Sequence, residues 1–171
     1  MIVKKIDKVL RTVEKVMIEV LFFVMILVVL AAVLNRMTVN RQMAWSDEFS
    51  RYVFIWMTFI AAAYASGEKA HIGVTALLDI LPHKIQHVVE VLLYFLCLVF
   101  SAAIFVYSIR IMQTQIAFGQ LSPSLRLPMQ YAYLGMTIGS GFMALHYILH
   151  IINYFLPKPT QLAEKKEDAE S

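Results

Sequence analysis

Charged residues are scarce in this chain. Asp, Glu, Lys and Arg together make up 16% of the 171 residues, whereas 60% are hydrophobic. A soluble domain of this size would carry about a quarter charged residues and about half apolar ones. The composition therefore argues against an ordinary soluble domain and indicates a membrane protein.

Cysteine is almost absent, and so are catalytic motifs. The single cysteine, Cys97, lies inside an apolar run, so no disulfide or zinc framework can form within one chain. The sequence contains no G-x-S-x-G, H-E-x-x-H or Walker-type motif, which argues against an enzyme. The formal charge is only +3, and the basic residues do not interleave with aromatic ones, so nucleic acid is not expected as a partner.

What the chain has instead is long runs without charge. A helix needs about 20 mostly apolar residues to cross the hydrocarbon core of a bilayer. We predict an all-α membrane protein with one transmembrane domain, residues 1–157, and a charged flexible tail, residues 158–171. The four predicted spans are about 16–35, 49–67, 88–110 and 128–155.

The basic residues predict the orientation. Four spans place both termini on one side, and that side carries ten of the Lys and Arg residues, against five on the other. Because positive residues are enriched in cytoplasmic loops, both termini are expected in the cytoplasm.

The N-terminal residues allow two interpretations. An apolar stripe recurs at helical spacing at Ile2, Ile6, Val9, Leu10 and Val13. It fits a basic amphipathic segment on the cytoplasmic leaflet. It fits equally well an early start of the first spanning helix.

The connections carry further signals. Residues 68–90 contain an apolar stripe that predicts a cytoplasmic segment lying in the membrane plane. From His83 to about Phe118 no helix breaker occurs, which predicts one helix of roughly 50 Å, longer than the roughly 30 Å core. Gly119 is expected to end it, and Pro128 suits the first turn of the last helix.

The stretch WSDEFSR, residues 45–51, precedes the second span. Ser46 can cap that helix, with Asp47 and Glu48 near its positive end. Arg51 follows Asp47 by four residues and Glu48 by three, so it can pair with either. Trp45 fits the aromatic belt at the membrane surface. The cluster is therefore read as a helix start, with contact to a partner as the alternative.

Small residues gather on two of the predicted helices, at Ala61, Ala62, Ala65, Gly135 and Gly139. Small residues let helices approach closely in lipid. These residues pack either within this chain's own bundle or against another membrane subunit.

Ionisable residues are missing from the middle of the predicted spans, so this chain alone is not expected to form a translocation path. His83 and His87 share one helix face, as do His146 and His150. A redox or metal-binding subunit using these pairs is the alternative function. Interfacial histidines with a solvated polar tip are the preferred interpretation, because too few further ligands accompany them.

Three motifs in order resemble a known family. W-S-D-E-F-S-R is followed by an aromatic and alanine-rich span, then by G-E-K-A-H-I-G-V at 67–74 and G-x-x-S-P-S-L-R-L-P-M-Q-Y-A-Y at 119–133. From about residue 5 to 155, the chain closely resembles the small membrane subunit of TRAP transporters (tripartite ATP-independent periplasmic transporters, DctQ type). Gln130 and Thr137 depart from the family's usual pattern, which weakens a subfamily assignment but not the family.

The resemblance implies a non-catalytic scaffold in the bacterial inner membrane. Its partners would be a large elevator permease, which carries the substrate and sodium sites, and a periplasmic substrate-binding protein. No cofactor is expected in this chain, and the substrate would be an organic acid, with sialic acid as the first guess and a C4-dicarboxylate as the next. Candidate periplasmic contacts are Trp45, Asp47, Glu48, Arg51, Ser122 and Arg126. Candidate packing residues toward the large subunit are the five small residues above, and Gly67 and His71 are family landmarks.

Overall fold

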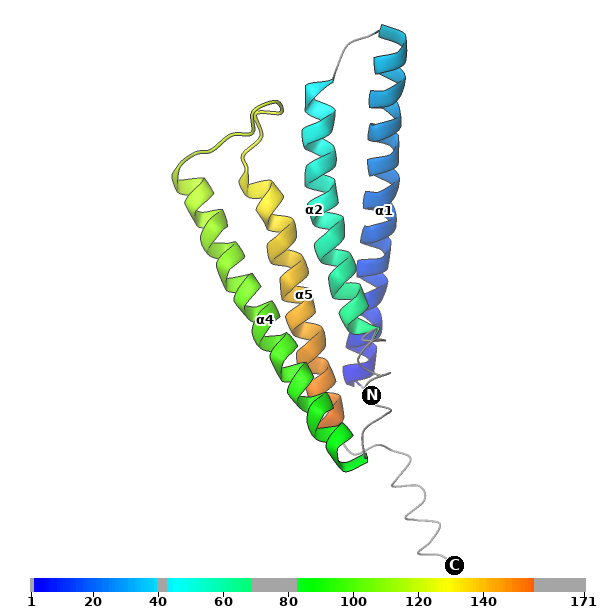
Figure 1. The fold of residues 1–171 in the computed structure, drawn as a ribbon, viewed down its shortest axis with the longest axis vertical. Helices are drawn as coiled ribbons and strands as arrows, with labels where there is room; N and C mark the ends of the chain where they lie inside the picture. The colour runs from blue at the N-terminus through cyan, green and yellow to red at the C-terminus, as the bar shows by residue number, and fades with distance from the viewer. Residues whose placement is uncertain (1, 40–42, 69–82, 156–171) are drawn as a thin grey trace, which may run out of the picture.

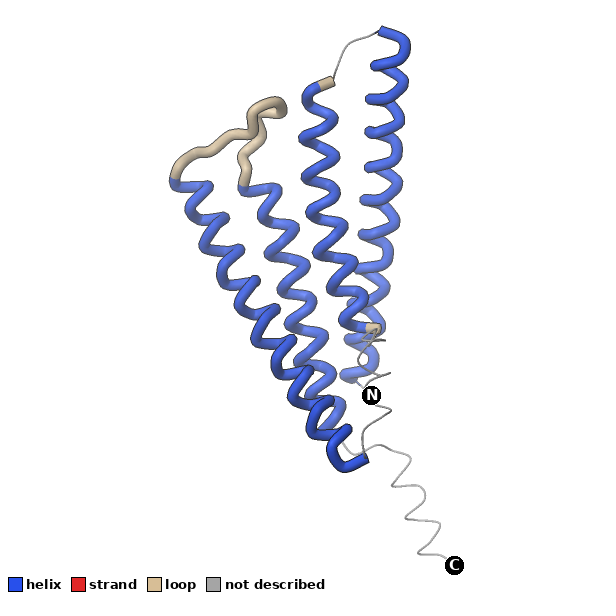
Figure 2. The backbone as a smooth tube through the Cα atoms, in the orientation of Figure 1, coloured by secondary structure: helices blue, strands red, loops and turns tan. Residues whose placement is uncertain are grey.

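Four long helices make up nearly all of the described part of the chain. The structure is a computed structural model that describes residues 2–39, 43–68 and 83–155. The helices are α1 (Ile2–Val39), α2 (Ala44–Gly67), α4 (His83–Ala117) and α5 (Gln130–Phe155). Figure 2 shows these helices in blue and the loop between α4 and α5 in tan. The all-α prediction is confirmed.

The helix α5 lies at the centre of the bundle. It packs against α4 on one side and α2 on the other, while α1 packs against α2 and touches α5 only slightly. Figure 1 shows the α4–α5 loop at the same end as the start of α2, and the chain's N-terminus at the opposite end. These two ends, called here the loop end and the N-terminal end, carry most of the polar contacts.

Two of the helices are longer than a bilayer core requires. The 38 residues of α1 and the 35 residues of α4 correspond to about 57 and 53 Å at 1.5 Å per residue. The prediction of one unbroken helix from His83 to about Phe118 is confirmed. At the N-terminus the backbone continues as one helix from Ile2, so the early-start interpretation describes the fold.

Three of the described helices have the length and apolar composition that membrane crossing requires. The stretches are Ile6–Thr38 in α1, Val88–Ala117 in α4 and Gln130–Ile152 in α5. The helix α2 is not among them, because its charged first turns leave only residues 52–67 as an uncharged run. The described part of the chain is thus all-helical, with three candidate membrane spans.

The end of α4 is set by local backbone geometry. Gly119 has a φ of +58°, which a residue with a side chain adopts only at a cost. Its N–H bonds to the Ile116 carbonyl, and the Gln120 N–H reaches back to the Gln115 carbonyl, the pair of bonds that closes a Schellman motif. The predicted stop at Gly119 is confirmed.

The start of α5 differs from the prediction. Pro128 does not lie in the first helical turn but two residues before the helix, where it forms an isolated antiparallel bridge with Leu121. The first helical bonds instead run from Tyr131 to the Pro128 carbonyl and from Ala132 to the Met129 carbonyl. The loop closes on itself before the helix can begin.

Two expectations concern residues that the structure does not describe. The in-plane segment of 68–90 lies largely in residues 69–82, and the flexible tail in residues 158–171. Both lie outside the described residues and stay predictions.

Candidate functional sites at the two ends of the bundle

The start of α2 is built differently from the expectation. The residue before the helix is Met43, and no side chain caps it. Ser46 lies inside the first turn, is 2% exposed, and its hydroxyl donates to the Met43 carbonyl at 2.7 Å. A capping side chain accepts a bond from a free N–H, whereas Ser46 donates to a carbonyl. The prediction that Ser46 caps this helix is therefore wrong, while Asp47 lies in the first turn as expected.

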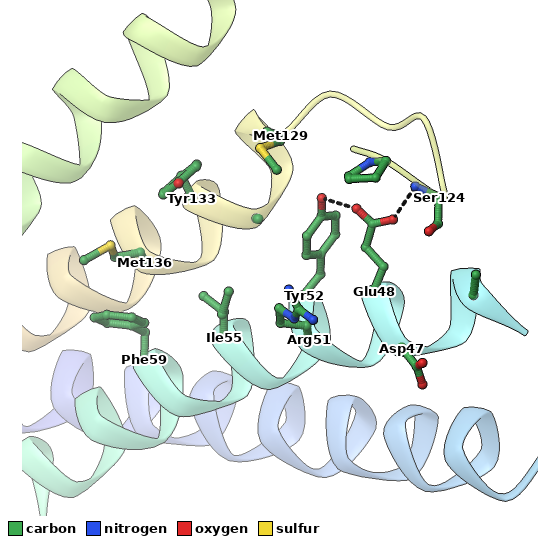
Figure 3. Close-up of a pocket in the computed structure, with 13 residues that line it drawn as sticks. Asp47, Glu48, Arg51, Tyr52, Ile55, Phe59, Ser124, Met129, Tyr133 and Met136 are labelled. Carbon is green, nitrogen blue, oxygen red and sulfur yellow. Dashed lines mark hydrogen bonds between the residues drawn. The ribbon is translucent and has the colours of Figure 1, made fainter. Parts of the chain in front are cut away.

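Glu48 ties α2 to the loop between α4 and α5. Its Oε2 accepts bonds from the backbone N–H groups of Ser124 at 2.8 Å and Leu125 at 3.0 Å. Its Oε1 accepts a bond from the Tyr52 hydroxyl at 3.2 Å. Figure 3 shows Glu48 and Tyr52 pointing together toward the loop. One carboxylate thus holds a loop 76 residues further along the chain.

These bonds also shift the acidity of Glu48. Partial desolvation raises its pKa, but the nearby Ser122 hydroxyl and the two backbone N–H groups lower it more, so the pKa lies below its ordinary value of 4.5. Hydrogen bonds to the ionised form have this effect because protonation removes an acceptor. The tie between α2 and the loop is therefore kept in mildly acidic solution.

Arg51 does not form the predicted ion pair. Among the described residues, its guanidinium has no carboxylate within 4.0 Å, and Asp47 likewise has no cationic partner. Glu48, the other expected partner, is turned to the loop. The predicted pairing of Arg51 with Asp47 or Glu48 is wrong, because the loop's N–H groups compete successfully for the Glu48 carboxylate.

The loop itself is tightly folded around a strained residue. Arg126 is exposed, with a φ of +52°, in the left-handed region that favours glycine. Its N–H bonds to the Ser122 carbonyl, and the Ser122 N–H bonds to the Leu127 carbonyl at 2.8 Å. Ser122 is only 2% exposed, whereas Trp45 on α2 is 43% exposed. Of the predicted contact residues, Trp45 and Arg126 face outward, and Ser122 supports the loop from within.

A cavity of about 460 Å³ opens between α2, α5 and this loop. Asp47, Glu48 and Arg51 line its charged end, and Ile55, Phe59 and Met136 line its apolar end. Figure 3 shows Asp47, Glu48 and Arg51 on the first turns of α2, Ile55 and Phe59 further along α2, and Met136 facing them from α5. The WSDEFSR cluster therefore forms the rim of a cavity as well as a helix start.

The N-terminal end of the bundle holds a buried charged cluster that no sequence motif suggested. Glu14 on α1 and His146 on α5 are both 0% exposed. The His146 Nε2 lies 3.0 Å from both carboxylate oxygens of Glu14, and its Nδ1 lies 3.2 Å from Asp7 Oδ1. Arg11 extends the cluster: its Nη2 lies 2.7 Å from Asp7 Oδ2, and its Nη1 lies 3.1 Å from Glu68 Oε1. The cluster joins α1, α2 and α5.

The geometry around His146 limits which groups can donate and which can accept in the cluster. An ionised carboxylate only accepts hydrogen bonds, and a neutral imidazole donates from one nitrogen only. Both ring nitrogens of His146 face carboxylate oxygens. Both contacts are hydrogen bonds only when Asp7, His146 and Glu14 share two protons, with both on the imidazole or one on a carboxyl.

Gly67 makes room for this histidine. A Cβ added at Gly67 would lie 2.8 Å from His146 Cε1 and 3.0 Å from its Nδ1. A real Cβ does not come that close, so only glycine lets the ring lie against the end of α2. This gives the family landmark Gly67 a physical reason, whereas His71 lies outside the described residues.

The interpretation of the histidines as solvated interfacial residues is wrong for His146 and His150. His150 is also buried, and its Nε2 lies 3.0 Å from the Ser66 carbonyl oxygen. The Tyr94 ring stacks on the His150 ring, with 5.5 Å between the ring centroids. Both rings are buried where the helices converge, and neither has a solvated tip. Within the described part of the chain, no group of His, Cys, Asp and Glu side chains has the arrangement of a metal site. The side chains of His83 and His87 are outside the described residues.

A signal for the charged cluster is present in the sequence but was missed. Asp7, Arg11 and Glu14 are spaced four and three residues apart, so they share one face of a helix. A charged face on a helix entering a membrane is expected to meet a polar partner. The histidine on the last helix is such a partner, but only the packing of α1 near α5 brings them together.

The glycines of α5 pack inside the bundle. A Cβ at Gly135 would meet the Trp56 ring at 2.5 Å, and one at Gly139 would meet the Phe59 backbone at 2.6 Å. The Trp56 Nε1–H also donates to the Tyr131 carbonyl at 2.8 Å. Both glycines therefore serve the α2–α5 contact within this chain, the first of the two alternatives. On α2, Ala65 is exposed, and Ala61 and Ala62 are half-buried.

Three described helices that are long and apolar enough to cross a membrane define an integral membrane protein. The model of the family described as "Tripartite ATP-independent periplasmic transporters, DctQ component" matches residues 25–156. The chain belongs to this family, whose members are components of a transporter and not enzymes.

Individual relatives agree with the family. The chain is 29% identical over 100 residues to the isethionate TRAP transporter permease protein DctMQ of Oleidesulfovibrio alaskensis, a match covering 58% of the chain and 16% of that protein. It is 39% identical over 72 residues to a putative TRAP transporter small permease protein of Haemophilus influenzae, covering 42% and 44%. It is 24% identical over 150 residues to the sialic acid TRAP transporter small permease protein SiaQ of Vibrio cholerae, covering 88% and 86%. The first two matches span less than half the length of the relative.

Proposed function

We propose that this chain is a non-catalytic scaffold in a sodium-coupled TRAP transporter that imports an organic acid across the bacterial inner membrane. The observation that carries the proposal is the family match over residues 25–156, which covers residues 25–39 of α1 and all of the other three helices. The partners would be a large elevator permease and a periplasmic binding protein. In this arrangement α2 is a fourth spanning helix and both termini are cytoplasmic.

Exposed apolar surface supports the scaffold role. In the most apolar 18-residue stretch of α1, no residue is buried within the chain. In the corresponding stretch of α4, only 11% of the residues are buried. Lipid or a second membrane subunit can cover such faces. We propose that the large permease packs along the bundle beside the small residues Ala61, Ala62 and Ala65 of α2. Gly135 and Gly139 take no direct part, because α2 already covers them.

The loop end is the proposed contact for periplasmic partners. Trp45 and Arg126 are exposed there, on α2 and on the loop that Glu48 holds. Exposed aromatic and arginine side chains are the residues that most often carry binding energy at interfaces. Glu48 and Ser122 would act indirectly, by fixing the loop's shape.

The substrate is proposed only as a class. The relatives are named for isethionate, C4-dicarboxylates and sialic acid, all of them organic acids. The residues that bind the substrate are expected in the large permease and the binding protein. A panel of these three substrates is therefore the first to test.

The test is reconstitution of the transporter with and without this chain. The large permease and the binding protein are placed in proteoliposomes, and uptake of each labelled acid is measured with and without a sodium gradient. We expect uptake only when all three proteins and the gradient are present. Full uptake by a stable permease without this chain would refute the scaffold role, and uptake independent of sodium would refute the coupling.

A further inference from the structure

The 460 Å³ cavity between α2, α5 and the loop has the form of a ligand site. Its volume lies in the range of small-molecule pockets, which are mostly apolar with a few placed polar groups. The apolar lining belongs to Ile55, Phe59 and Met136 among others. Methionine side chains adapt to flexible apolar ligands. Neither the family match nor the proposed scaffold role explains why the chain has such a cavity.

The cavity crosses the level at which the candidate span of α5 begins. That span starts at Gln130, so Met136 lies within it, whereas Ser124 precedes it in the loop. Glu48 bonds to Ser124, which places the charged rim at loop level. Along α2, Phe59 follows Arg51 by eight residues, or about 12 Å of helix. The charged end is therefore level with the start of the candidate span of α5, and the apolar end lies beside the span itself.

The charges at the rim are not equivalent. Glu48 is occupied by the loop's two N–H groups and the Tyr52 hydroxyl. Arg51 is exposed and has no ion-pair partner among the described residues. A guanidinium offers several N–H donors in a planar fork that matches a phosphate. An unpaired Arg51 above an apolar cavity is thus complementary to a phosphate attached to a hydrocarbon chain.

We propose that this cavity binds one phospholipid, with its phosphate on Arg51 and one acyl chain along the α2–α5 face toward Phe59 and Met136. Asp47 lines the same rim, so a headgroup with an ammonium next to its phosphate suits the site better than an anionic one. The bound lipid fills the space between α2 and α5 near the loop. The proposal concerns this chain's own residues and does not depend on the substrate or on the binding protein.

The experiment is native mass spectrometry of the purified transporter complex with added lipid. The probe is phosphatidylethanolamine, and diacylglycerol with the same acyl chains is the control that lacks a phosphate. Met136→Trp fills the apolar end and should abolish retention of the lipid. Arg51→Gln should weaken binding of phosphatidylethanolamine about tenfold and leave binding of diacylglycerol unchanged, as expected for loss of one charged contact worth about 1.4 kcal/mol.

Matched variants on α4 separate this site from general lipid attachment. Arg110→Gln removes an exposed arginine that contacts the Tyr107 ring, and Ile116→Trp adds bulk at an exposed apolar position. Neither residue lines the cavity, so both variants should retain the lipid like the wild type. Circular dichroism of each variant checks that the helices are intact.

Several results would overturn the proposal. One is that Met136→Trp or Arg51→Gln retains phosphatidylethanolamine as well as the wild type does. Another is equal retention of phosphatidylethanolamine and diacylglycerol by the wild type. A third is lipid bound to the isolated small subunit but expelled in the complex, which would make the cavity a docking site for the large permease. These outcomes measure lipid binding alone, so they can be interpreted even if the uptake experiment above fails.

Discussion

Removing Glu14 should detach the N-terminal part of α1 from the bundle. Its carboxylate and the His146 imidazole are both fully buried and lie 3.0 Å apart. Removing one partner of a buried charged pair costs about 3–5 kcal/mol, because the other is left buried without compensation. Asp7 still faces the second ring nitrogen and is partly exposed, so we expect the lower part of that range, about 3 kcal/mol, for Glu14→Ala.

A double-mutant cycle isolates the pair. Glu14→Ala, His146→Ala and the double variant are unfolded reversibly with sodium dodecyl sulfate in mixed micelles, and the free energy of unfolding is followed by circular dichroism. Because the double variant leaves neither partner unpaired, it should cost less than the two single variants together. We expect a coupling energy of about 2 kcal/mol, within the range for residues in one polar network.

Glu19 supplies the matched control on the same helix. Its side chain is 62% exposed and lies 3.9 Å from Lys15. Exposed pairs of this kind contribute about 0–1 kcal/mol, so Glu19→Ala should be nearly neutral. A coupling energy below about 0.5 kcal/mol, or equal costs for Glu14→Ala and Glu19→Ala, would refute the reasoning.

Three further predictions follow from individual contacts. Gly67→Ala places a Cβ 2.8 Å from His146 Cε1 and should lower the free energy of unfolding by about 1–3 kcal/mol in the same micelle assay. The hydrogen bond from the Ser124 N–H to Glu48 should persist above pH 4.5 and be lost as the pH falls through the lowered pKa of Glu48. The measurement is the protection factor of the Ser124 amide, which should fall as its exchange approaches the intrinsic rate at the same pH. Arg126→Gly should be about 1 kcal/mol more stable than Arg126→Ala, because glycine adopts the φ of +52° without strain.

Each of these predictions has a control. Gly141→Ala meets only the edge of the Phe105 ring at 3.2 Å and should cost less than Gly67→Ala. In Glu48→Gln the protection factor of the Ser124 amide should not change as the pH falls. An identical pH response in both proteins would contradict the assignment. If Arg126 contacts a periplasmic partner, both of its variants should reduce uptake in proteoliposomes despite their different stability. Normal uptake in both would remove Arg126 from the interface.

Local sequence signals predicted the helices well. The unbroken stretch from His83 and the stop at Gly119 follow from the absence and presence of helix breakers, which act over a few residues. The same holds for the end of α2 at the landmark Gly67. Where prediction failed locally, at Ser46 and Pro128, distant or competing bonds replaced the expected ones.

The sequence by itself determined that this chain is a helical membrane protein of the TRAP small-permease family, because composition, run length and ordered motifs are properties of the chain alone. Only the tertiary structure decided which polar groups meet. Glu48 holds Ser124 rather than Arg51, and Glu14 meets His146 across 132 residues of chain. Such partners depend on how helices pack, and burial gives these contacts their energy, so no local pattern could have assigned them.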